Sequence, residues 1–135
     1  MSLTQKNIYF SNGSSSSCGV LTAFSKDYEI EVVNVIKDNE GRFLILDVIR
    51  KDHVFRLGNI YAPTRNFEQN QIQVLDNFSW FINNSPIDNI IAGGDWNLYM
   101  SILDKMDTIP DSNDNKTYRQ NVKSFLEVNN MVDVW

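Results

Sequence analysis

The chain has 135 residues, of which 42% are hydrophobic, and its formal net charge is −5 at pH 7. This length indicates one domain, and three Trp, five Tyr and eight Phe supply enough apolar surface for a core. The net charge is negative, and the sequence contains no run of like charges. These features exclude a protein that binds nucleic acid mainly through a large positively charged surface. They do not exclude a nuclease, whose carboxylates can lie in the site and bind metal there.

Cysteine use and hydropathy bound the compartment. The single cysteine, Cys18, has no internal disulfide partner, so the fold does not need an oxidising compartment. No run approaches the roughly 18 apolar residues of a membrane span, and residues 1–7 lack the apolar region of a signal peptide. We therefore expect no membrane partner and an intracellular protein. No second cysteine or evident histidine partner accompanies Cys18, which argues against a cysteine nucleophile.

The first half of the chain predicts strands. Apolar and charged residues alternate over 28–32 and again over 54–61, and the alternation slips at Val32-Val33, which indicates a bulge. Residues 43–46 are continuously apolar, as in a strand buried on both faces. Shorter strands are expected at 7–10 and 19–24, a flexible serine-rich loop at 11–18, and turns at 38–41 and 50–52. Residues 19–61 therefore predict an antiparallel meander, with the only histidine, His53, as a solvated residue beside a turn.

The period changes after Pro63. Apolar residues at spacings of three and four predict a helix over 68–84 that ends at Ser85-Pro86, and a second helix over 117–130. The stripe of the first helix comprises Ile72, Leu75, Phe78 and Phe81 or Ile82; that of the second comprises Tyr118, Val122, Phe125 and Leu126. Trp80 lies off the first stripe and is expected to pack under a neighbouring loop. Residues 109–115 predict a plain loop, because the glycine and distal glutamate of a calcium loop are absent.

The stretch 90–97 carries the clearest candidate chemistry. Ile90 to Ala92 predict a short strand covered on both faces, and Gly93-Gly94 remove side chains where that strand ends, so that a backbone or a ligand can approach. If the extended path continues, Asp95 and Asn97 project to one side, where they suit a phosphate site. The alternative is a simple turn, since Gly, Asp and Asn are common turn residues.

The order of elements predicts an α/β sandwich with a site beyond the strand ends. Two strand ends carry site-like residues: the stretch 59–63, N-I-Y-A-P, and the stretch 93–97, G-G-D-W-N. In this order and spacing they resemble the endonuclease/exonuclease/phosphatase superfamily, and most closely the apurinic-type endonuclease domain of LINE-class retrotransposons. Further matches are the Gly-Val strand after the serines (14–24), E-G-R-F (40–43) and L-D-K (103–105), and residues 126–135 resemble the family's L-x-D-x-W close.

The resemblance implies a two-sheet, deoxyribonuclease I-like fold and metal-assisted hydrolysis of DNA phosphodiesters, with Mg²⁺ or Mn²⁺. Asp95 would orient or deprotonate the attacking water and serve as a metal ligand. Asn97 would hydrogen-bond the scissile phosphate, Tyr61 would stabilise charge that develops on it, and Asn59 would chiefly support the strand end. These three residues form the implied substrate-binding set.

The departures from the family pattern are as informative. Members bring an Asn and a metal-ligating Glu from near the domain's start, and an Asp and the His of an S-D-H motif from its end. Neither set is present: Glu29, Glu31 and Glu40 lie in strands or turns, and His53 does not match the terminal histidine. We therefore expect residues 1–135 to be a single partial domain, cut at both ends and weak or inactive alone.

Three interpretations of the function follow. The first is a fragment of a retrotransposon endonuclease, in which case a reverse transcriptase region in a longer polyprotein and a nuclear destination are expected. The second is a phosphoinositide or phospholipid phosphoesterase of the same superfamily. The third is a non-enzymatic remnant or binding module.

Overall fold

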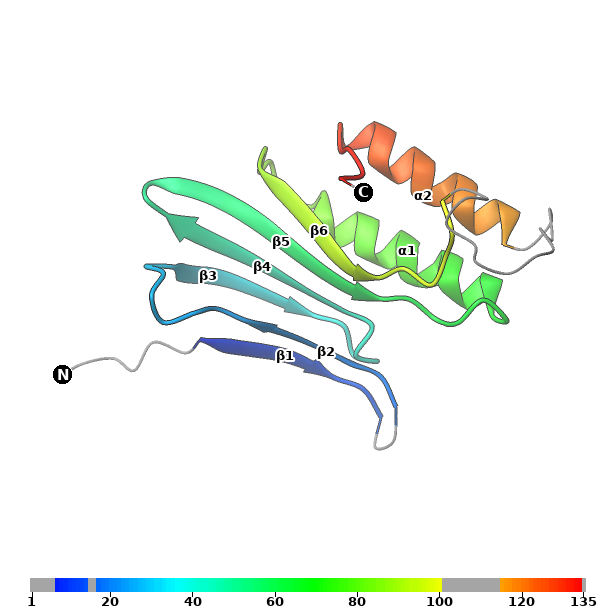
Figure 1. Cartoon of the computed structure of the whole chain (residues 1–135), viewed down its shortest axis with the longest axis horizontal. Coiled ribbons are helices and arrows are strands. Elements are labelled where there is room, and N and C mark those ends of the chain that lie inside the picture. Colours follow the sequence, from blue (N-terminus) through cyan, green and yellow to red (C-terminus); the bar gives the residue numbers. More distant parts are fainter. Residues whose placement is uncertain (1–6, 15–16, 101–114, 135) are drawn as a thin grey trace.

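The computed structural model describes residues 7–14, 17–100 and 115–134. It shows an α/β arrangement of three layers: a β-hairpin, a mixed four-stranded sheet, and two helices on the far side of that sheet (Figure 1). The elements in chain order are β1 (Ile8–Asn12), β2 (Gly19–Ala23), β3 (Glu31–Lys37), β4 (Phe43–Arg50), β5 (His53–Tyr61), α1 (Glu68–Ile82), β6 (Ile90–Asp95) and α2 (Lys116–Val128). The two-sheet α/β fold expected from the sequence is thus the observed one.

The predicted meander over 19–61 is wrong at its first strand. β2 pairs antiparallel with β1, and only β3, β4 and β5 form the meander of the main sheet, in the order β3-β4-β5-β6. Leu44, Leu46 and Val48 of β4 face the hairpin and, with Val20 of β2, form the core between the two sheets. The hairpin is therefore a separate layer, because β2 packs its apolar residue onto the face of the main sheet instead of joining its edge.

Several strand boundaries also differ from the prediction. Ser11 and Asn12 belong to β1 and not to a loop, since the Ser11 side chain is buried and donates to the Asp38 carbonyl at 2.7 Å. β3 begins only at Glu31, and its pairing with β4 shifts between Val32 and Asn34, which confirms the predicted bulge. β4 is buried on both faces as expected, and it extends to Arg50.

A second core lies between the main sheet and the helices. The stripes predicted for both helices are confirmed, and they pack on the sheet residues of the same face; the buried members are Phe43, Ile45, Ile60, Ala62, Leu75, Phe78, Ile82, Tyr118, Val122 and Phe125. Gly58 lies beneath α1, where a Cβ would meet the Phe78 ring at 2.5 Å. Trp80, by contrast, is 62% exposed and stacks edge-on against Phe81, so its predicted packing under a loop is wrong.

One buried ion pair fixes α1 to the sheet. The Arg56 guanidinium donates to both carboxylate oxygens of Asp47, at 2.7 and 2.9 Å, and to the carbonyls of Ile82 and Ser85 where the helix ends. Burial raises the pKa of Asp47, but hydrogen bonds from Arg56 and Asn34 and the charge of Arg56 outweigh it, so the pKa lies below its ordinary value. This ion pair is fully hydrogen-bonded and lies away from the carboxyl ends of β5 and β6, so its role is structural.

Candidate active site

Tyr61 and Asp95 lie side by side at one end of the main sheet. β5 and β6 are parallel, and their last paired residues are Tyr61 and Asp95, with Asn59 paired to Gly93 one step further in. Because side chains alternate along each strand, these four positions share one face, the face that looks toward the hairpin. Both strands end at the same edge (Figure 1), so the two sequence motifs meet as the resemblance requires.

Gly93 and Gly94 of β6 differ in the space around their Cα atoms. Gly94 has φ +127°, and a Cβ there would collide with the carbonyl oxygen of Ile60 on β5, so only glycine allows the two strands to pair at this point. A Cβ on Gly93 would meet nothing within 4 Å. The strand therefore runs through both glycines to Asp95, which rules out the simple turn, and it leaves open space beside Asn59 and Tyr61.

β6 is not covered on both faces, contrary to the prediction. Ile90 and Ala92 pack toward the helices, whereas Ile91 is 59% exposed on the opposite face. In the described part of the chain, β6 pairs with β5 alone and has a free outer edge. The continuous apolar sequence of β6 does not distinguish a strand covered on one face from a strand covered on both.

Asn97 does not continue the extended path. It has φ +47°, a left-handed conformation that asparagine tolerates, and so it turns the chain back toward β5. Its backbone N–H donates to the Asp95 carboxylate at 2.9 Å, and its side-chain Nδ2 donates to the Ala62 carbonyl at 2.7 Å. Asn97 thus orients Asp95 and joins the two strand ends, while its carboxamide keeps one N–H and its oxygen for another partner.

Gln71 of α1 connects the segments that follow β5 and β6, a role that was not predicted from the sequence. This fully buried side chain of α1 donates to the carbonyls of Pro63 and Asn97, at 2.8 and 3.1 Å, and accepts from Asn115 at 2.6 Å. It occupies a helix-stripe position, four residues before Leu75. A polar residue at a core position was the available signal, because a buried amide must satisfy its hydrogen bonds.

α2 supports the turn after β6 from the other side. The Tyr118 hydroxyl donates to the Trp96 carbonyl at 2.9 Å, and Arg119 Nε donates to the Tyr99 carbonyl at 2.7 Å. Burial and then the negative charge of Asp95 raise the pKa of Tyr118 above its ordinary value. The phenol therefore stays protonated and keeps its hydrogen bond to the turn.

Asn59 hydrogen-bonds the hairpin from β5, two residues before Tyr61. Its Nδ2 donates to the Leu21 carbonyl at 3.0 Å and to the Thr22 hydroxyl at 3.3 Å. Asn59 therefore ties β5 to the hairpin across the gap between the two sheets, beside the candidate site.

The side chains at the carboxyl ends of β5 and β6 meet one requirement of a metal site. Asp95 is exposed and offers a hard carboxylate oxygen of the kind that Mg²⁺ uses. Across residues 7–14, 17–100 and 115–134, no group of three or more His, Cys, Asp or Glu side chains could hold a metal ion. Glu31 pairs with Ile49 at the opposite end of the main sheet.

The remaining candidates lie elsewhere. His53 is exposed and begins β5 after a tight turn in which Lys51 and Asp52 both have positive φ, so it stands at the end opposite Tyr61. The described residues include Cys18 as a free thiol, half-buried and 3.8 Å from the Ser17 hydroxyl. Most of the predicted loop at 109–115 and the L-D-K stretch at 103–105 fall outside the described residues.

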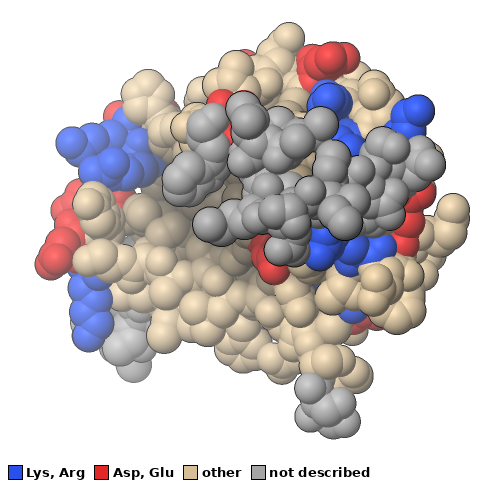
Figure 2. All heavy atoms as spheres, turned by 45° about the vertical axis from the view of Figure 1, so that its right-hand side comes forward, with Lys and Arg blue, Asp and Glu red and all other residues tan. Residues whose placement is uncertain are grey.

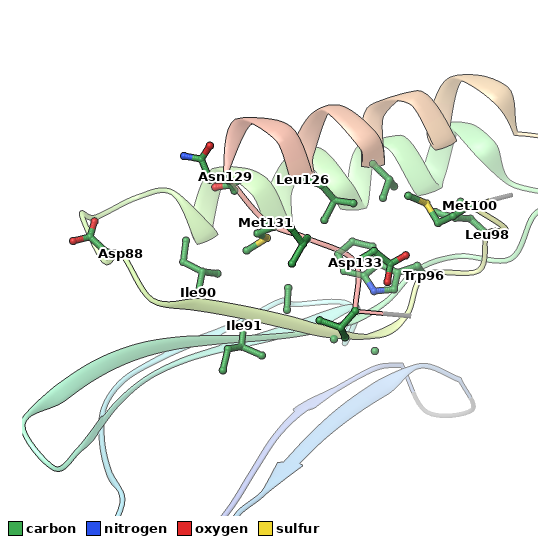
Figure 3. Close-up of a pocket in the computed structure, with 17 residues that line it drawn as sticks. Asp88, Ile90, Ile91, Trp96, Leu98, Met100, Leu126, Asn129, Met131 and Asp133 are labelled. Carbon is green, nitrogen blue, oxygen red and sulfur yellow. The ribbon is translucent and has the colours of Figure 1, made fainter.

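An apolar cavity of about 800 Å³ lies beside the free edge of β6 (Figure 3). In Figure 3, Ile90, Leu126 and Met131 point into the space between the strand and α2, and Ile91 points away from it. Neither Tyr61 nor Asp95 lines this cavity. The candidate residues at the strand ends therefore lie outside this cavity.

The comparisons with known proteins agree with this fold and with the resemblance. No model of a protein family matches the chain. The chain is 29% identical over 131 residues to an uncharacterised 149 kDa protein of transposon TX1 from Xenopus laevis, covering 95% of this chain and 9% of that protein. The described part of the chain includes no helix that is long and apolar enough to cross a membrane.

Solved structures of TDP2 are similar to part of this chain in fold. A D. rerio TDP2 humanised by 14 mutations superposes with a TM-score of 0.50 at 22% identity, covering 69% of this chain and 41% of that one. A truncated Caenorhabditis elegans TDP2 gives 0.47 at 23% identity, over 77% and 44% of the two chains. The chain is therefore similar to the D. rerio TDP2 in fold and to a transposon protein in sequence. It spans less than half the length of each relative.

Proposed function

We propose that this chain forms the central part of a domain that hydrolyses DNA phosphodiester bonds, as in the endonucleases of LINE-class retrotransposons. The observation that carries the proposal is the pairing of Tyr61 with Asp95 at the ends of two parallel strands, with Asn97 hydrogen-bonded to Asp95. The similarity to a transposon protein along 95% of the chain favours DNA over a phosphoinositide or phospholipid substrate. In the parent protein, a reverse transcriptase region would accompany the domain.

Each side chain has a distinct task in this proposal. The Asp95 carboxylate accepts a hydrogen bond from the attacking water, orients it, and takes up its proton. The free N–H of the Asn97 carboxamide donates to a non-bridging phosphate oxygen, because its other N–H is held by Ala62. The Tyr61 hydroxyl donates to the charge that develops on the phosphoryl group. Gln71 and Tyr118 hold the two strand ends so that these groups do not need to rearrange.

We propose Mg²⁺ as the cofactor, with Mn²⁺ as a substitute. Asp95 would contribute a ligand, and substrate oxygens, water and residues of the longer protein would contribute the others. The ion would neutralise charge on the phosphoryl oxygens. With one carboxylate from the described residues, we expect the 135-residue chain to bind the ion weakly and to have negligible activity.

A plasmid-relaxation assay tests the proposal. The 135-residue chain is expected to leave supercoiled DNA intact with Mg²⁺ or Mn²⁺, whereas a protein extended by its flanking sequence should nick it. In the extended protein, Asp95→Ala should abolish nicking, and Asn97→Ala should slow it by roughly 100-fold, as removal of a transition-state donor does. Asp88→Ala is the matched control, since Asp88 precedes β6 at the strand's opposite end. Undiminished nicking by Asp95→Ala, or robust nicking by the short chain, would contradict the proposal.

A further inference from the structure

The outer edge of β6 presents backbone hydrogen-bonding groups to a further strand. The carbonyls of Asn89 and Asp95, at the two ends of β6, accept hydrogen bonds from the β5 side, each at 2.8 Å. Because backbone groups alternate from one side of a strand to the other, the N–H and C=O of Ile90 and Ala92 point away from β5. In the described part of the chain, no strand pairs with this edge. The edge therefore has the donors and acceptors that another strand requires.

The sequence of β6 is complementary to itself in one antiparallel register. The strand reads Ile-Ile-Ala-Gly-Gly from residue 90 to residue 94. When two copies pair with Ala92 opposite Ala92, Ile90 lies opposite Gly94 and Ile91 lies opposite Gly93. A large side chain thus meets a glycine on both faces of the sheet. The neighbouring registers place Ile91 opposite Ile91, which crowds the pair, or Gly93 opposite Gly93, which leaves a gap.

The structure leaves room for both of these contacts. Ile91 is exposed, and a Cβ on Gly93 would meet nothing within 4 Å, so the Ile91 side chain of a second copy fits in front of Gly93. On the opposite face, Ile90 and Gly94 both line the apolar cavity between β6 and α2 (Figure 3). The Ile90 side chain of the second copy would enter this cavity. Pairing therefore covers apolar surface on both faces of β6.

The charges near β6 are compatible with this pairing. In the register centred on Ala92, Asp95 lies opposite Asn89. Asp88 lies opposite Trp96, so neither acid faces an acid of the other copy. The end of the molecule that Figure 2 brings forward shows Lys and Arg interspersed with Asp and Glu, with no continuous basic face. That surface does not select a partner of opposite charge, whereas the apolar fit at β6 selects a second β6.

We propose that a second copy of this chain pairs with β6, antiparallel and with Ala92 on the two-fold axis. The four-stranded sheets of the two copies then join into one continuous sheet. An interface of this kind uses the same surface on both copies, so pairing at this edge closes at a dimer. The proposal concerns association alone and is independent of phosphodiester hydrolysis.

Disulfide formation between two cysteine variants tests the register. Ile91→Cys and Gly93→Cys are prepared separately in a Cys18→Ser background, since Cys18 is the one cysteine of the chain, and are mixed in equal amounts in a glutathione buffer. Positions 91 and 93 of opposite copies form a non-hydrogen-bonded pair with Cα atoms about 4.5 Å apart, which suits a disulfide.

Each variant alone is the control for the mixture. Two copies of Ile91→Cys, or two of Gly93→Cys, would place their sulfur-bearing positions about 7–8 Å apart between Cα atoms, which is too far for an unstrained disulfide. The mixed disulfide should therefore exceed each homodimeric disulfide by about tenfold, as measured by mass spectrometry. The same mixture unfolded in urea should give a statistical distribution of the three products.

A second measurement uses the dimerisation constant of the 135-residue chain from sedimentation equilibrium. Gly93→Leu fills the space that Ile91 of the second copy would occupy, so it should weaken dimerisation by about tenfold or more. Gln73→Leu adds the same side chain at an exposed position of α1 and should leave the constant unchanged. Thermal melts establish that each variant is folded.

Three results would overturn the inference. The first is a statistical mixture, or an excess of one homodimeric disulfide, in the folded protein. The second is equal dimerisation of the two leucine variants. The third is an unmutated chain that stays monomeric at the highest concentration measured.

Discussion

At the residue scale, the site depends on side chains that bind backbone more than on those that face solvent. Asn97 and Gln71 together occupy the carbonyls of Ala62, Pro63 and Asn97. These are strand-end and turn carbonyls, and they have no ladder partner to satisfy them. Each amide thus replaces a missing backbone hydrogen bond, and the result is a fixed distance between the two sequence motifs.

Replacing Gln71 with Leu tests this role. The buried carbonyls of Pro63 and Asn97 and the Asn115 amide would lose their partner, so we expect unfolding to become easier by about 1–3 kcal/mol. Urea denaturation followed by tryptophan fluorescence measures the change. Gln73→Leu is the control, because Gln73 is exposed on the same helix. Equal stability of the two variants would show that Gln71 does not hold the strand ends.

At the scale of elements, the parallel pair β5 and β6 positions the chemistry. α1 connects the two strands and packs on the face opposite Tyr61 and Asp95, through Leu75, Phe78 and Ile82. A parallel pair needs such a crossover, and the crossover brings both carboxyl ends to the same edge. The site is therefore a consequence of the connection between the strands.

The glycines of β6 offer a paired test of this arrangement. Gly94→Ala would place a Cβ against the Ile60 carbonyl at a positive φ, so it should separate the strands and cost about 3 kcal/mol or more. Gly93→Ala meets open space and should change stability by no more than about 1 kcal/mol. Chemical denaturation compares the two. Similar losses for both variants would show that the close approach at Gly94 is not what requires glycine.

At the scale of the whole molecule, β6 has a free outer edge in the described part of the chain, and this edge lies beside exposed apolar surface. Ile91 is 59% exposed, and the cavity of about 800 Å³ beside the strand is lined mainly by apolar side chains. An unpaired strand edge next to such a cavity is a site for association with other chains. Association of the chain in solution should therefore depend on this edge.

We expect the purified chain to bind a hydrophobic dye and to associate at micromolar concentrations. Ile91→Lys should shift it toward monomer, because a charged residue on an edge strand opposes pairing. Light scattering coupled to size exclusion gives the mass. Leu21→Lys is the control, since Leu21 is 57% exposed on the hairpin. A monomeric, dye-free chain that melts sharply would contradict the expectation.

The sequence by itself determined the elements and the residues at their ends. Periodicity identified both helices and the bulge in β3, and the motifs at 59–63 and 93–97 marked the strand ends that carry Tyr61, Asp95 and Asn97. These are local properties, since side-chain spacing and backbone preference act within a few residues.

The tertiary structure alone decided which elements are neighbours. The separation of β2 from the meander, the bare face of Ile91 and the burial of Gln71 all depend on contacts between distant parts of the chain. An apolar run has the same pattern with one face covered or two, and the stripe position of Gln71 indicates burial without identifying the carbonyls that the side chain binds. Burial and partner are set by packing, and packing joins residues whose positions in the sequence carry no record of one another.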